Sequence, residues 1–500
     1  MQLKQISRLI MGITLGLCII SYSGSETTNV KLDNSSNGGT GDQINVGIPV
    51  DDINNFARVY AITKSYYVES VTDTKLIKGA IEGMLTNLDP HSAYLDKDSY
   101  RQLSEMTSGS FAGLGIEVSR DKDAGGIKII APIDGTPAFK AGIKSGDVIM
   151  KIDGAAVTEL TLDEAIKKMR GKVGTKVSLT ISRKSELKPL VFNIARATIE
   201  VRSIKYTTLA MHYAYVRITN FQADTVENLV TALKSIYAND HDLKGLVLDL
   251  RDDPGGILQS AVGTVGAFIP ANSLVVYTDG RAPNAKQKFY VKPDDYATGD
   301  IKNDILNQVP KIFKTLPIVA VVNQGTASAA EIVAGALQDY KRVKIIGTRT
   351  FGKGSVQTVI PLSEDTAVKL TTALYYTPAG RSIQAQGIKP DIIVKNEYSD
   401  LYDSWDLSEA NLDHHIDNPT GTVLITKDKD NTPVITPPKQ ISTTAELKAR
   451  FDQQRQNLPK VVKPDAAVVD LPTDFQLQWA LNILEGKSLP SQDQHSSSKK

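Results

Sequence analysis

The chain has 500 residues, of which 41% are hydrophobic and 23% are charged, and its formal net charge is +1. A chain of this length and composition folds into about two to four globular domains, and its balanced charge gives no reason to expect nucleic acid or an anionic membrane surface as a partner. The single cysteine, Cys18, excludes a disulfide scaffold, a thiol nucleophile in the folded body and a cysteine-based zinc site.

The first residues predict an export signal. Lys4 and Arg8 precede an apolar stretch at 9–20, and mostly small residues follow. The apolar stretch is short for a membrane span. We therefore expect a signal peptide at 1–25, a polar linker at 26–50 and a periplasmic location, with an uncleaved anchor in the inner membrane as the alternative.

Residues 51–105 are expected to form a helical segment. Between positions 76 and 88, apolar side chains recur every three or four residues and form one stripe. The run Leu88-Asp-Pro-His-Ser-Ala-Tyr-Leu95 then breaks the helix. His91 in this run is a tempting catalytic group, but no other catalytic motif surrounds it, so we expect a structural role at the end of a helix.

Residues 106–196 change to short strands and glycine-containing turns. In Phe111-Ala-Gly-Leu-Gly-Ile-Glu-Val118, the glycines allow successive backbone amides to point into one concavity, which suits a carboxylate. The run Ala141-Gly-Ile-Lys-Ser-Gly-Asp-Val-Ile149 is a more specific signal, and a helix at 162–169 precedes a strand at 176–183. These features resemble a PDZ domain, which implies binding of a protein C-terminus as an added strand. The residues assigned to that terminus are Gly113, Leu114, Gly115 and Ile116. The alternative is a small β domain whose glycines only make turns.

Strands and helices alternate between 197 and 398. Nearly all-apolar strands are predicted at 245–250 and 316–323, and the second is followed by a helix at 329–340 and a strand at 343–347. This order predicts an α/β core with a largely parallel sheet. Active sites in such sheets lie beyond the C-terminal ends of the strands.

The remainder of the chain carries less pattern. Residues 399–470 are rich in Asp, Asn, Lys and Thr and are expected to be a low-order insertion, whereas 471–500 should contain a helix and a polar tail. His414 and His415 lie without acidic or cysteine residues at ligand spacing, so no metal site is expected.

Ser328 is a candidate nucleophile. It lies in Asn323-Gln-Gly-Thr-Ala-Ser-Ala-Ala-Glu331, between a predicted strand and a predicted helix. A serine here has a plain structural explanation as a helix cap. The same position also places its Oγ at a helix N-terminus, where free amides and a positive potential favour an oxyanion.

Lys353 is the candidate base, because no histidine lies near the serine in the sequence. It occurs in Thr350-Phe-Gly-Lys-Gly-Ser-Val-Gln357. An exposed lysine keeps a pKa near ~10.4 and is a useless base at neutral pH, whereas burial disfavours the ammonium form. Gln357 is spaced to hydrogen-bond the amine and orient it. A lone loop lysine is usually solvated, so the hypothesis depends on the serine, the lysine and the third element described next occurring together in one α/β core.

A third element follows the strand at 245–250. The run Arg251-Asp-Asp-Pro-Gly-Gly-Ile-Leu258 contains two glycines that permit close approach of a backbone to a substrate. The amide of Gly255 or Gly256, together with that of Ala329, would form an oxyanion hole. Pro-Gly-Gly is also an ordinary turn signal.

Together these motifs resemble the carboxyl-terminal processing (tail-specific) serine proteases, over roughly 51–394. The matching runs are Leu88-Asp-Pro-His-Ser92, the PDZ run, Leu248-Asp-Leu-Arg-Asp-Asp-Pro-Gly-Gly-Ile-Leu258, Thr326-Ala-Ser-Ala-Ala-Glu331, the Lys353 run and Tyr376-Thr-Pro-Ala-Gly-Arg-Ser-Ile-Gln384. The resemblance implies an α/β core of the crotonase/ClpP-like kind with an inserted β-rich PDZ domain and an N-terminal helical segment.

The resemblance also implies roles and partners. Ser328 matches the nucleophile, Lys353 the general base and Gln357 the residue that supports the lysine. Backbone groups of Gly255 or Gly256 and Ala329 match the oxyanion donors. The implied activity is that of an endopeptidase that cleaves exported proteins from or near apolar C-termini, with no metal and no cofactor. An adaptor protein, a homo-oligomer and an association with the inner membrane stay open.

The chain departs from the family pattern at two places. Thr326 and Ala330 stand where serines are usual, which implies only changed packing. Asp252 and Asp253 stand where asparagines are common, and carboxylates beside an oxyanion are electrostatically unfavourable. Both side chains are therefore expected to point away from the cleft.

Two other functions remain in view. One is a non-catalytic PDZ scaffold that binds peptides on the same fold. The other is a small-ligand binder, since the fold also occurs in retinoid-binding proteins. The intact set of Ser328, Lys353 and Gln357 argues against both.

Overall fold

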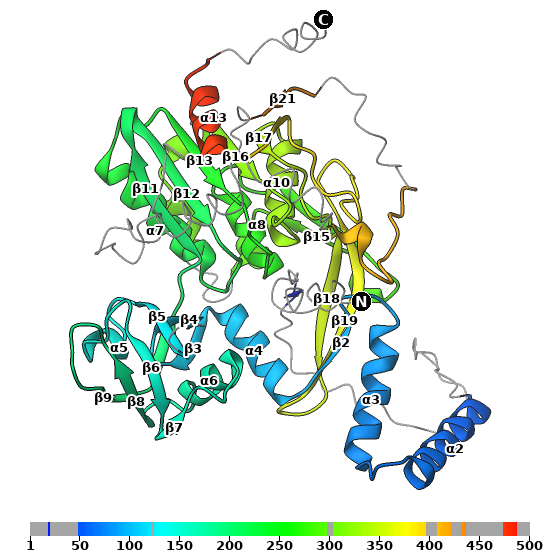
Figure 1. Cartoon of the computed structure of the whole chain (residues 1–500). Helices are drawn as coiled ribbons and strands as arrows, with labels where there is room; N and C mark the ends of the chain where they lie inside the picture. Colours follow the sequence, from blue (N-terminus) through cyan, green and yellow to red (C-terminus); the bar gives the residue numbers. More distant parts are fainter. Residues whose placement is uncertain are drawn as a thin grey trace, which may run out of the picture.

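The computed structural model describes residues 19–20, 49–121, 125–297, 304–396, 408–421, 432–436 and 474–487. The expected signal peptide, apart from the backbone of Ile19–Ile20, and most of the expected linker lie outside these residues, as do most of 399–473 and the tail after 487. The described chain forms N-terminal helices, a small β-rich domain and an α/β core (Figure 1).

The N-terminal part consists of α2 (Val50–Tyr66), α3 (Asp73–Thr86), β2 (Ala93–Leu95) and α4 (Lys97–Ser108). Thr72 and Asp96 start α3 and α4, because each side chain accepts a hydrogen bond from a backbone N–H of the first turn. Gly109, at φ 73°, ends α4 in the left-handed conformation. No side chain of α2 is buried, and this helix lies far from the core (Figure 1).

The β-rich domain folds around its own hydrophobic core. Its elements are β4 (Ile116–Asp121), β5 (Gly126–Pro132), α5 (Pro137–Lys140), β6 (Val148–Ile152), β7 (Ala155–Ala156), α6 (Leu162–Met169), β8 (Lys176–Ser182) and β9 (Leu190–Ala195). The α6 helix occupies its predicted range, because Thr161 and Glu164 form a reciprocal capping box at its start. The sheet order is β4-β5-β6-β8-β9, so β4 is an edge strand. A ribbon of β3 (Ser110–Gly113) and β10 (Ala197–Glu200) lies where the chain enters and leaves this domain.

The main sheet of the core is mixed. In spatial order its strands are β11 (Ile204–Leu209), β12 (Tyr213–Ile218), β13 (Gly245–Asp249), β16 (Ile318–Val322), β17 (Lys344–Gly347), β20 (Ile392–Val394) and β21 (Val434–Ile435). The β11 and β12 strands are antiparallel, and each later pair of neighbours is parallel. Every residue of β13 and β16 is buried, which explains why both appear in the sequence as nearly continuous apolar runs.

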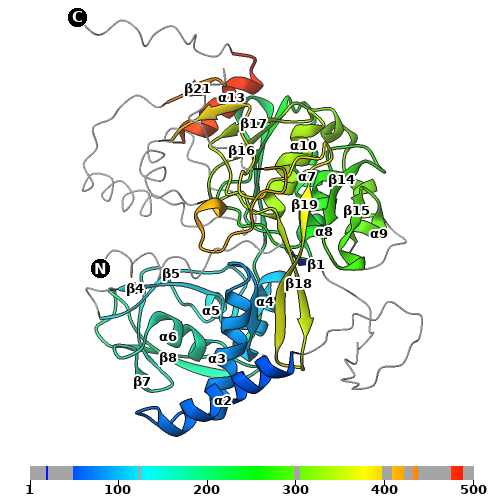
Figure 2. The same ribbon diagram turned by 90° about the vertical axis from the view of Figure 1, so that its right-hand side faces the viewer.

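Helices cover both faces of this sheet. The helices α7 (Thr225–Asn239), α8 (Leu258–Gly266) and α10 (Ala329–Asp339) contribute to one hydrophobic cluster, and α13 (Phe475–Leu484) contributes to another. Leu246 and Leu248 of β13 belong to the first cluster, and Val247 between them belongs to the second. Alternating strand residues face opposite sides of a sheet, so the core is a three-layer α/β structure (Figure 2).

A second sheet carries part of the site. It contains β14 (Leu274–Asp279), β15 (Gln287–Tyr290), β18 (Ser355–Pro361) and β19 (Ala367–Tyr376), with the backbone of β1 (Ile19–Ile20) beside β18 and with β2 beside β19. The β18 and β19 strands form a hairpin that extends from the core toward the N-terminal helices (Figures 1 and 2). The predicted elements do not include this hairpin, although β-branched and aromatic residues on both sides of a polar turn are its signal.

Short elements complete the described chain. They are α9 (Pro293–Tyr296) and 3₁₀ turns at Ala210–His212, Pro283–Ala285, Ile305–Gln308, Lys311–Lys314 and Glu409–Asn411. Among the described helices, none combines the length and the apolar character that crossing a bilayer requires.

Candidate active site

Ser328 lies between β16 and the first residue of α10. Its backbone has φ 56° and ψ −116°, a conformation that residues with a side chain rarely adopt, and its side chain is fully buried. Its Oγ has no hydrogen-bond partner among the described residues. No acceptor in the described part of the chain holds the hydrogen of this hydroxyl, so the hydroxyl stays available for chemistry.

Glu331, in the first turn of α10, collects four hydrogen bonds. Its Oε2 accepts from the backbone N–H groups of Ser328 at 2.8 Å and Lys353 at 2.9 Å. Its Oε1 accepts from the backbone of Gly352 at 2.8 Å and from the hydroxyl of Thr350 at 2.5 Å. Complete burial raises the pKa of Glu331 to about 7, although all four donors favour its carboxylate form.

Lys353 lies in the loop before β18, and its side chain is fully buried. Its Nζ donates to the carbonyl oxygen of Ser355 at 3.1 Å and to Oε1 of Gln357 at 2.5 Å. Both acceptors are uncharged, so they can accept the N–H bonds of a neutral amine, and the lone pair of a neutral amine can take a proton. Burial also removes the water that would stabilise an ammonium ion.

The same two buried groups fix the backbones of Ser328 and Lys353. One is the Glu331 carboxylate, whose Oε2 accepts from both N–H groups. The other is Tyr375, whose hydroxyl donates to the carbonyl oxygen of Ser328 at 3.0 Å and also contacts that of Lys353. The serine and lysine loops are thus held relative to each other even though no hydrogen bond joins their side chains.

The expected oxyanion donors lie against the serine. A Cβ on Gly255 would lie 2.7 Å from the backbone nitrogen of Ala329, so these two backbones are in close contact. The N–H of Gly255, however, donates to Oδ1 of Asp253 at 2.8 Å. Gly256, at φ 147°, has no room for a side chain, because a Cβ would lie 2.0 Å from the carbonyl oxygen of Phe221. Asp253 does not accept a hydrogen bond from the N–H of Gly256, so Gly256 is the better candidate of the two for an oxyanion donor.

The two aspartates of this loop behave differently. Asp252 is exposed, and its Oδ1 accepts from Nδ2 of Asn323 at 2.8 Å, as expected for a side chain that points away. Asp253 instead turns inward and is fully buried, contrary to the expectation for it. Burial raises the pKa of Asp253 well above its usual range, so the uncharged carboxyl is favoured and the electrostatic objection to it is weakened.

Thr326 keeps the hydroxyl that a serine would supply at this position. Its Oγ1 donates to the carbonyl oxygen of Leu250 at 2.7 Å and accepts from the backbone of Asn323 at 3.0 Å. These bonds attach the serine loop to the end of β13. Ala330 is fully buried in the core.

His91 and Glu409 form a buried pair beside the lysine loop. The Nε2 of His91 lies 2.9 Å from both carboxylate oxygens of Glu409, and the two side chains are 3% and 1% exposed. Gln384 donates to the same carboxylate at 3.1 Å and accepts from the backbone of Gly354 at 2.9 Å. Burial lowers the pKa of His91, Glu409 opposes this shift, and Lys353 lowers it further when its amine is protonated. His91 therefore does more than end a helix.

The segment that carries Glu409 belongs to 399–470, where a low-order insertion is expected. Its described residues 408–421 pack on the core: Glu409 donates its backbone N–H to Phe351, and Asn418 donates to the backbone of Gln384 at 2.7 Å. The segment also contains local turns, but the bonds that attach Glu409 and Asn418 to the core are with residues distant in the chain, which no local sequence pattern marks.

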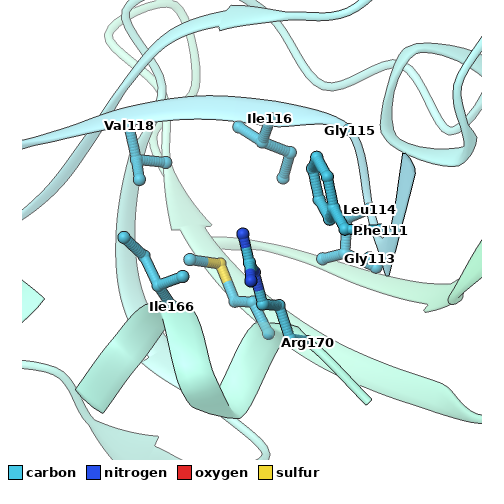
Figure 3. Close-up of a pocket in the computed structure, with 9 residues that line it drawn as sticks. Phe111, Gly113, Leu114, Gly115, Ile116, Val118, Ile166 and Arg170 are labelled. Atoms are coloured by element: carbon cyan, nitrogen blue, oxygen red, sulfur yellow. The ribbon is translucent and has the colours of Figure 1, made fainter. Parts of the chain in front are cut away.

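An apolar groove lies between β4 and α6 of the β-rich domain. It encloses about 220 Å³ and is lined by Phe111, Gly113, Leu114, Gly115, Ile116, Val118, Ile166, Met169 and Arg170 (Figure 3). The four residues expected to receive a carboxylate are therefore all part of its lining. Only glycine fits at position 115, because its φ is 76° and a Cβ there would lie 2.3 Å from Cβ of Thr136. The Arg170 guanidinium lies 4.7 Å from the ring centre of Phe111 and pairs with Glu105 at 2.5 Å.

Several groups around the site were not assigned a role from the sequence. Glu331 and Gln384 lie inside motifs that the sequence analysis identifies, but the sequence does not predict which residues their side chains contact. Tyr375 precedes such a motif by one residue, and Glu409 has no local signal. Among the described residues, no group of three or more His, Cys, Asp and Glu side chains is arranged to hold a metal ion.

Comparison with known proteins identifies three family regions in the chain. Residues 11–99 match the model of the activating protease CtpB N-terminal domain, residues 102–182 match that of the PDZ domain, and residues 212–394 match that of peptidase family S41. The last of these regions contains the serine, the lysine and both glycines of the candidate oxyanion hole.

Individual proteins are also similar to the chain. A carboxy-terminal-processing protease of Bartonella bacilliformis is 44% identical over 365 residues, which cover 72% of this chain and 80% of the relative. A probable CtpA-like serine protease of Staphylococcus aureus is 37% identical over 344 residues, which cover 69% of this chain and 65% of the relative. A solved photosystem II D1 C-terminal processing protease is 27% identical with a TM-score of 0.38, over 68% of this chain and 86% of that one. The chain belongs to peptidase family S41 and is a serine protease of the carboxy-terminal-processing kind with a PDZ domain.

Proposed function

We propose that this endopeptidase uses Ser328 as its nucleophile, Lys353 as its general base and Gln357 as the residue that supports the lysine. The observation that carries the proposal is the fully buried lysine amine, which donates to two uncharged acceptors. The shared attachment of both loops to Glu331 supports it further.

The reaction follows from these positions. Lys353 takes the proton of the Ser328 hydroxyl as Oγ attacks the scissile carbonyl, and the backbone N–H groups of Gly256 and Ala329 donate to the resulting oxyanion. The lysine returns the proton to the leaving amine, and an acyl-enzyme forms. Water then attacks the ester carbon while the amine of Lys353 accepts the water's proton. The lysine passes this proton to Oγ of Ser328 as the ester bond breaks, which releases the new C-terminus and restores the serine.

Substrate choice is assigned to the PDZ groove. An apolar C-terminal tail would lie in the groove and extend the sheet at β4, with its carboxylate at the backbone of Gly113, Leu114, Gly115 and Ile116. The edge position of β4 and the apolar lining support this assignment. The substrates would be exported proteins with apolar C-termini, and an adaptor protein that delivers them is compatible with this arrangement.

We further propose a periplasmic location, with the anchor at the inner membrane as the alternative to cleavage, and a core of the crotonase/ClpP-like class. A homo-oligomer is supported by α2, on which Val50, Val59 and Ile62 are all more than half exposed. The balanced charge of the chain gives no support to nucleic-acid binding.

The test compares wild type with Ser328→Ala and Lys353→Ala on an unfolded protein that carries either an apolar or an acidic C-terminal tail. Each variant should lose roughly 10³-fold or more in kcat/KM. Lys344→Ala, which removes an exposed lysine of the same core, is the matched control and should cleave like wild type.

The outcomes separate the candidate functions. Cleavage by wild type that prefers the apolar tail supports both the serine–lysine pair and the tail recognition. Binding of the tail without cleavage by any of the proteins would favour the non-catalytic scaffold. Full activity of Ser328→Ala would show that another residue is the nucleophile.

A further inference from the structure

The two ends of the Gln357 side-chain amide face different partners. Oε1 accepts from Nζ of Lys353 at 2.5 Å, and Nε2 donates to the hydroxyls of Ser355 and Thr371, both at 3.1 Å. A reversed amide would direct an N–H donor at the lysine amine. That donor would bind the lone pair that has to take the proton of the serine, so the orientation of this amide matters for catalysis.

Thr371 determines which way round the amide lies. It faces Gln357 across the β18–β19 hairpin, and its Oγ1 donates to Oδ1 of Asp89 at 2.9 Å. A hydroxyl has a single hydrogen. Because the carboxylate takes that hydrogen, Oγ1 can only accept from Gln357, and only Nε2 of the amide can donate to it.

Asp89 in turn is held as an acceptor. It is 4% exposed, and its Oδ1 also accepts from the backbone N–H groups of His91 at 2.8 Å and Ser92 at 3.0 Å. The hydroxyl of Ser92 donates to Oδ2 at 2.6 Å. Burial alone would raise the pKa of Asp89, but the bonds from Ser92, His91 and Thr371 lower it overall. An ionised carboxylate cannot donate, so the direction of every bond in this series is fixed.

We propose that Asp89, from the N-terminal segment, is a positioning residue for the reaction: through Thr371 it fixes the Gln357 amide so that its oxygen, and not an N–H donor, faces the amine of Lys353. The proposal rests on the proposed function. A second contact strengthens the link, because Ser92 Oγ accepts from the backbone N–H of Thr371 at 3.1 Å. The helical N-terminal part then does more than support the protease core, because it supplies Asp89 at the end of the hydrogen-bond series Lys353–Gln357–Thr371–Asp89.

The experiment uses the full chain with Asp89→Ala, Thr371→Val and the double variant, and with Asp89→Asn and Thr371→Ser as conservative changes. Asparagine keeps an oxygen that can receive the three donors at Oδ1, and serine keeps the hydroxyl. Asp98→Asn, an exposed aspartate of α4, is the matched control. The measurements are kcat and KM on a short peptide, and the rate at which a fluorophosphonate labels Ser328.

Asp89→Ala and Thr371→Val should each lower kcat and the labelling rate by roughly 10- to 100-fold, the range typical for groups that orient a functional ligand, while KM stays within about twofold. The two conservative variants and the control should stay within about threefold of wild type. Because both residues act through one series, the double variant should be no slower than Asp89→Ala.

Three results would overturn the proposal: wild-type rates in both Asp89→Ala and Thr371→Val, losses that multiply in the double variant, or a loss in Asp89→Asn as large as in Asp89→Ala. Thr371→Val leaves Asp89 and its turn intact, so it decides the matter if Asp89→Ala fails to fold. A wild type that neither cleaves nor takes the label would refute the proposed function itself, whereas an active wild type matched by its variants would refute only the role of Asp89.

Discussion

The lysine loop and the PDZ groove differ in how far their polar groups are buried and bonded. Around Lys353 the polar side chains are buried and their hydrogen bonds run within the protein, whereas the groove is open, mostly apolar, and bordered by an edge strand. The buried hydrogen bonds hold the catalytic side chains in one geometry, whereas the open groove leaves room for a bound peptide. Changes in the lysine loop should therefore act on kcat, and changes in the groove should act on KM for tailed substrates.

The largest effect is expected from Glu331→Gln, which tests whether the buried hydrogen bonds around Lys353 position the catalytic groups. An amide nitrogen cannot accept hydrogen bonds, so two of the four donors around this residue lose their acceptor, at a cost of about 1–3 kcal/mol each in unfolding free energy. We expect kcat to fall roughly 10²-fold or more, because the serine and lysine backbones lose their common attachment. Peptide kinetics and urea unfolding measure the two effects.

Glu364→Gln, an exposed change at the turn of the β18–β19 hairpin, is the control for this experiment. A Glu331→Gln protein with wild-type kcat would mean that the four-donor carboxylate does not position the serine and the lysine.

The open side of the comparison is tested by Ile166→Glu. Ile166 lines the groove from α6, and a glutamate there removes apolar surface and repels the carboxylate of a bound tail. KM for the apolar-tailed substrate should rise roughly tenfold, or about 1.4 kcal/mol, with little change in kcat on a peptide that has no tail.

Val191→Glu adds the same charge at an exposed position on β9 and should leave KM unchanged. Equal KM values for wild type and Ile166→Glu would exclude the groove as the tail site.

Asp253→Asn should change activity least, within about threefold, because asparagine can keep the bond from Gly255. Its effect is on stability. The raised pKa of the folded carboxyl means that the folded state binds a proton that the unfolded state has released, so wild-type stability falls as pH rises above about 4, by about 1.4 kcal/mol per pH unit, until the folded carboxyl ionises.

The asparagine variant lacks this dependence, so its advantage over wild type should be larger at pH 8 than at pH 5 in urea unfolding. A constant difference between the two pH values would mean that Asp253 is already ionised in the folded protein.

The sequence was most informative where the signal is local. The predicted helix at 162–169, the strand ahead of Ser328 and the loop of Lys353 all depend on neighbouring residues and lie close to their observed positions. Contacts between distant segments could not be obtained in this way. The burial of Asp253 and the bond from Thr371 to Asp89 depend on how strands and loops pack, and the sequence alone does not show this packing.

The pair of His91 and Glu409 joins positions 318 residues apart in the chain. Synthesis begins at the N-terminus, so the histidine and the serine exist well before the glutamate does. The buried pair beside the lysine loop can form only after residue 409 has been added, so the surroundings of the base are completed later in synthesis than the serine and the lysine themselves.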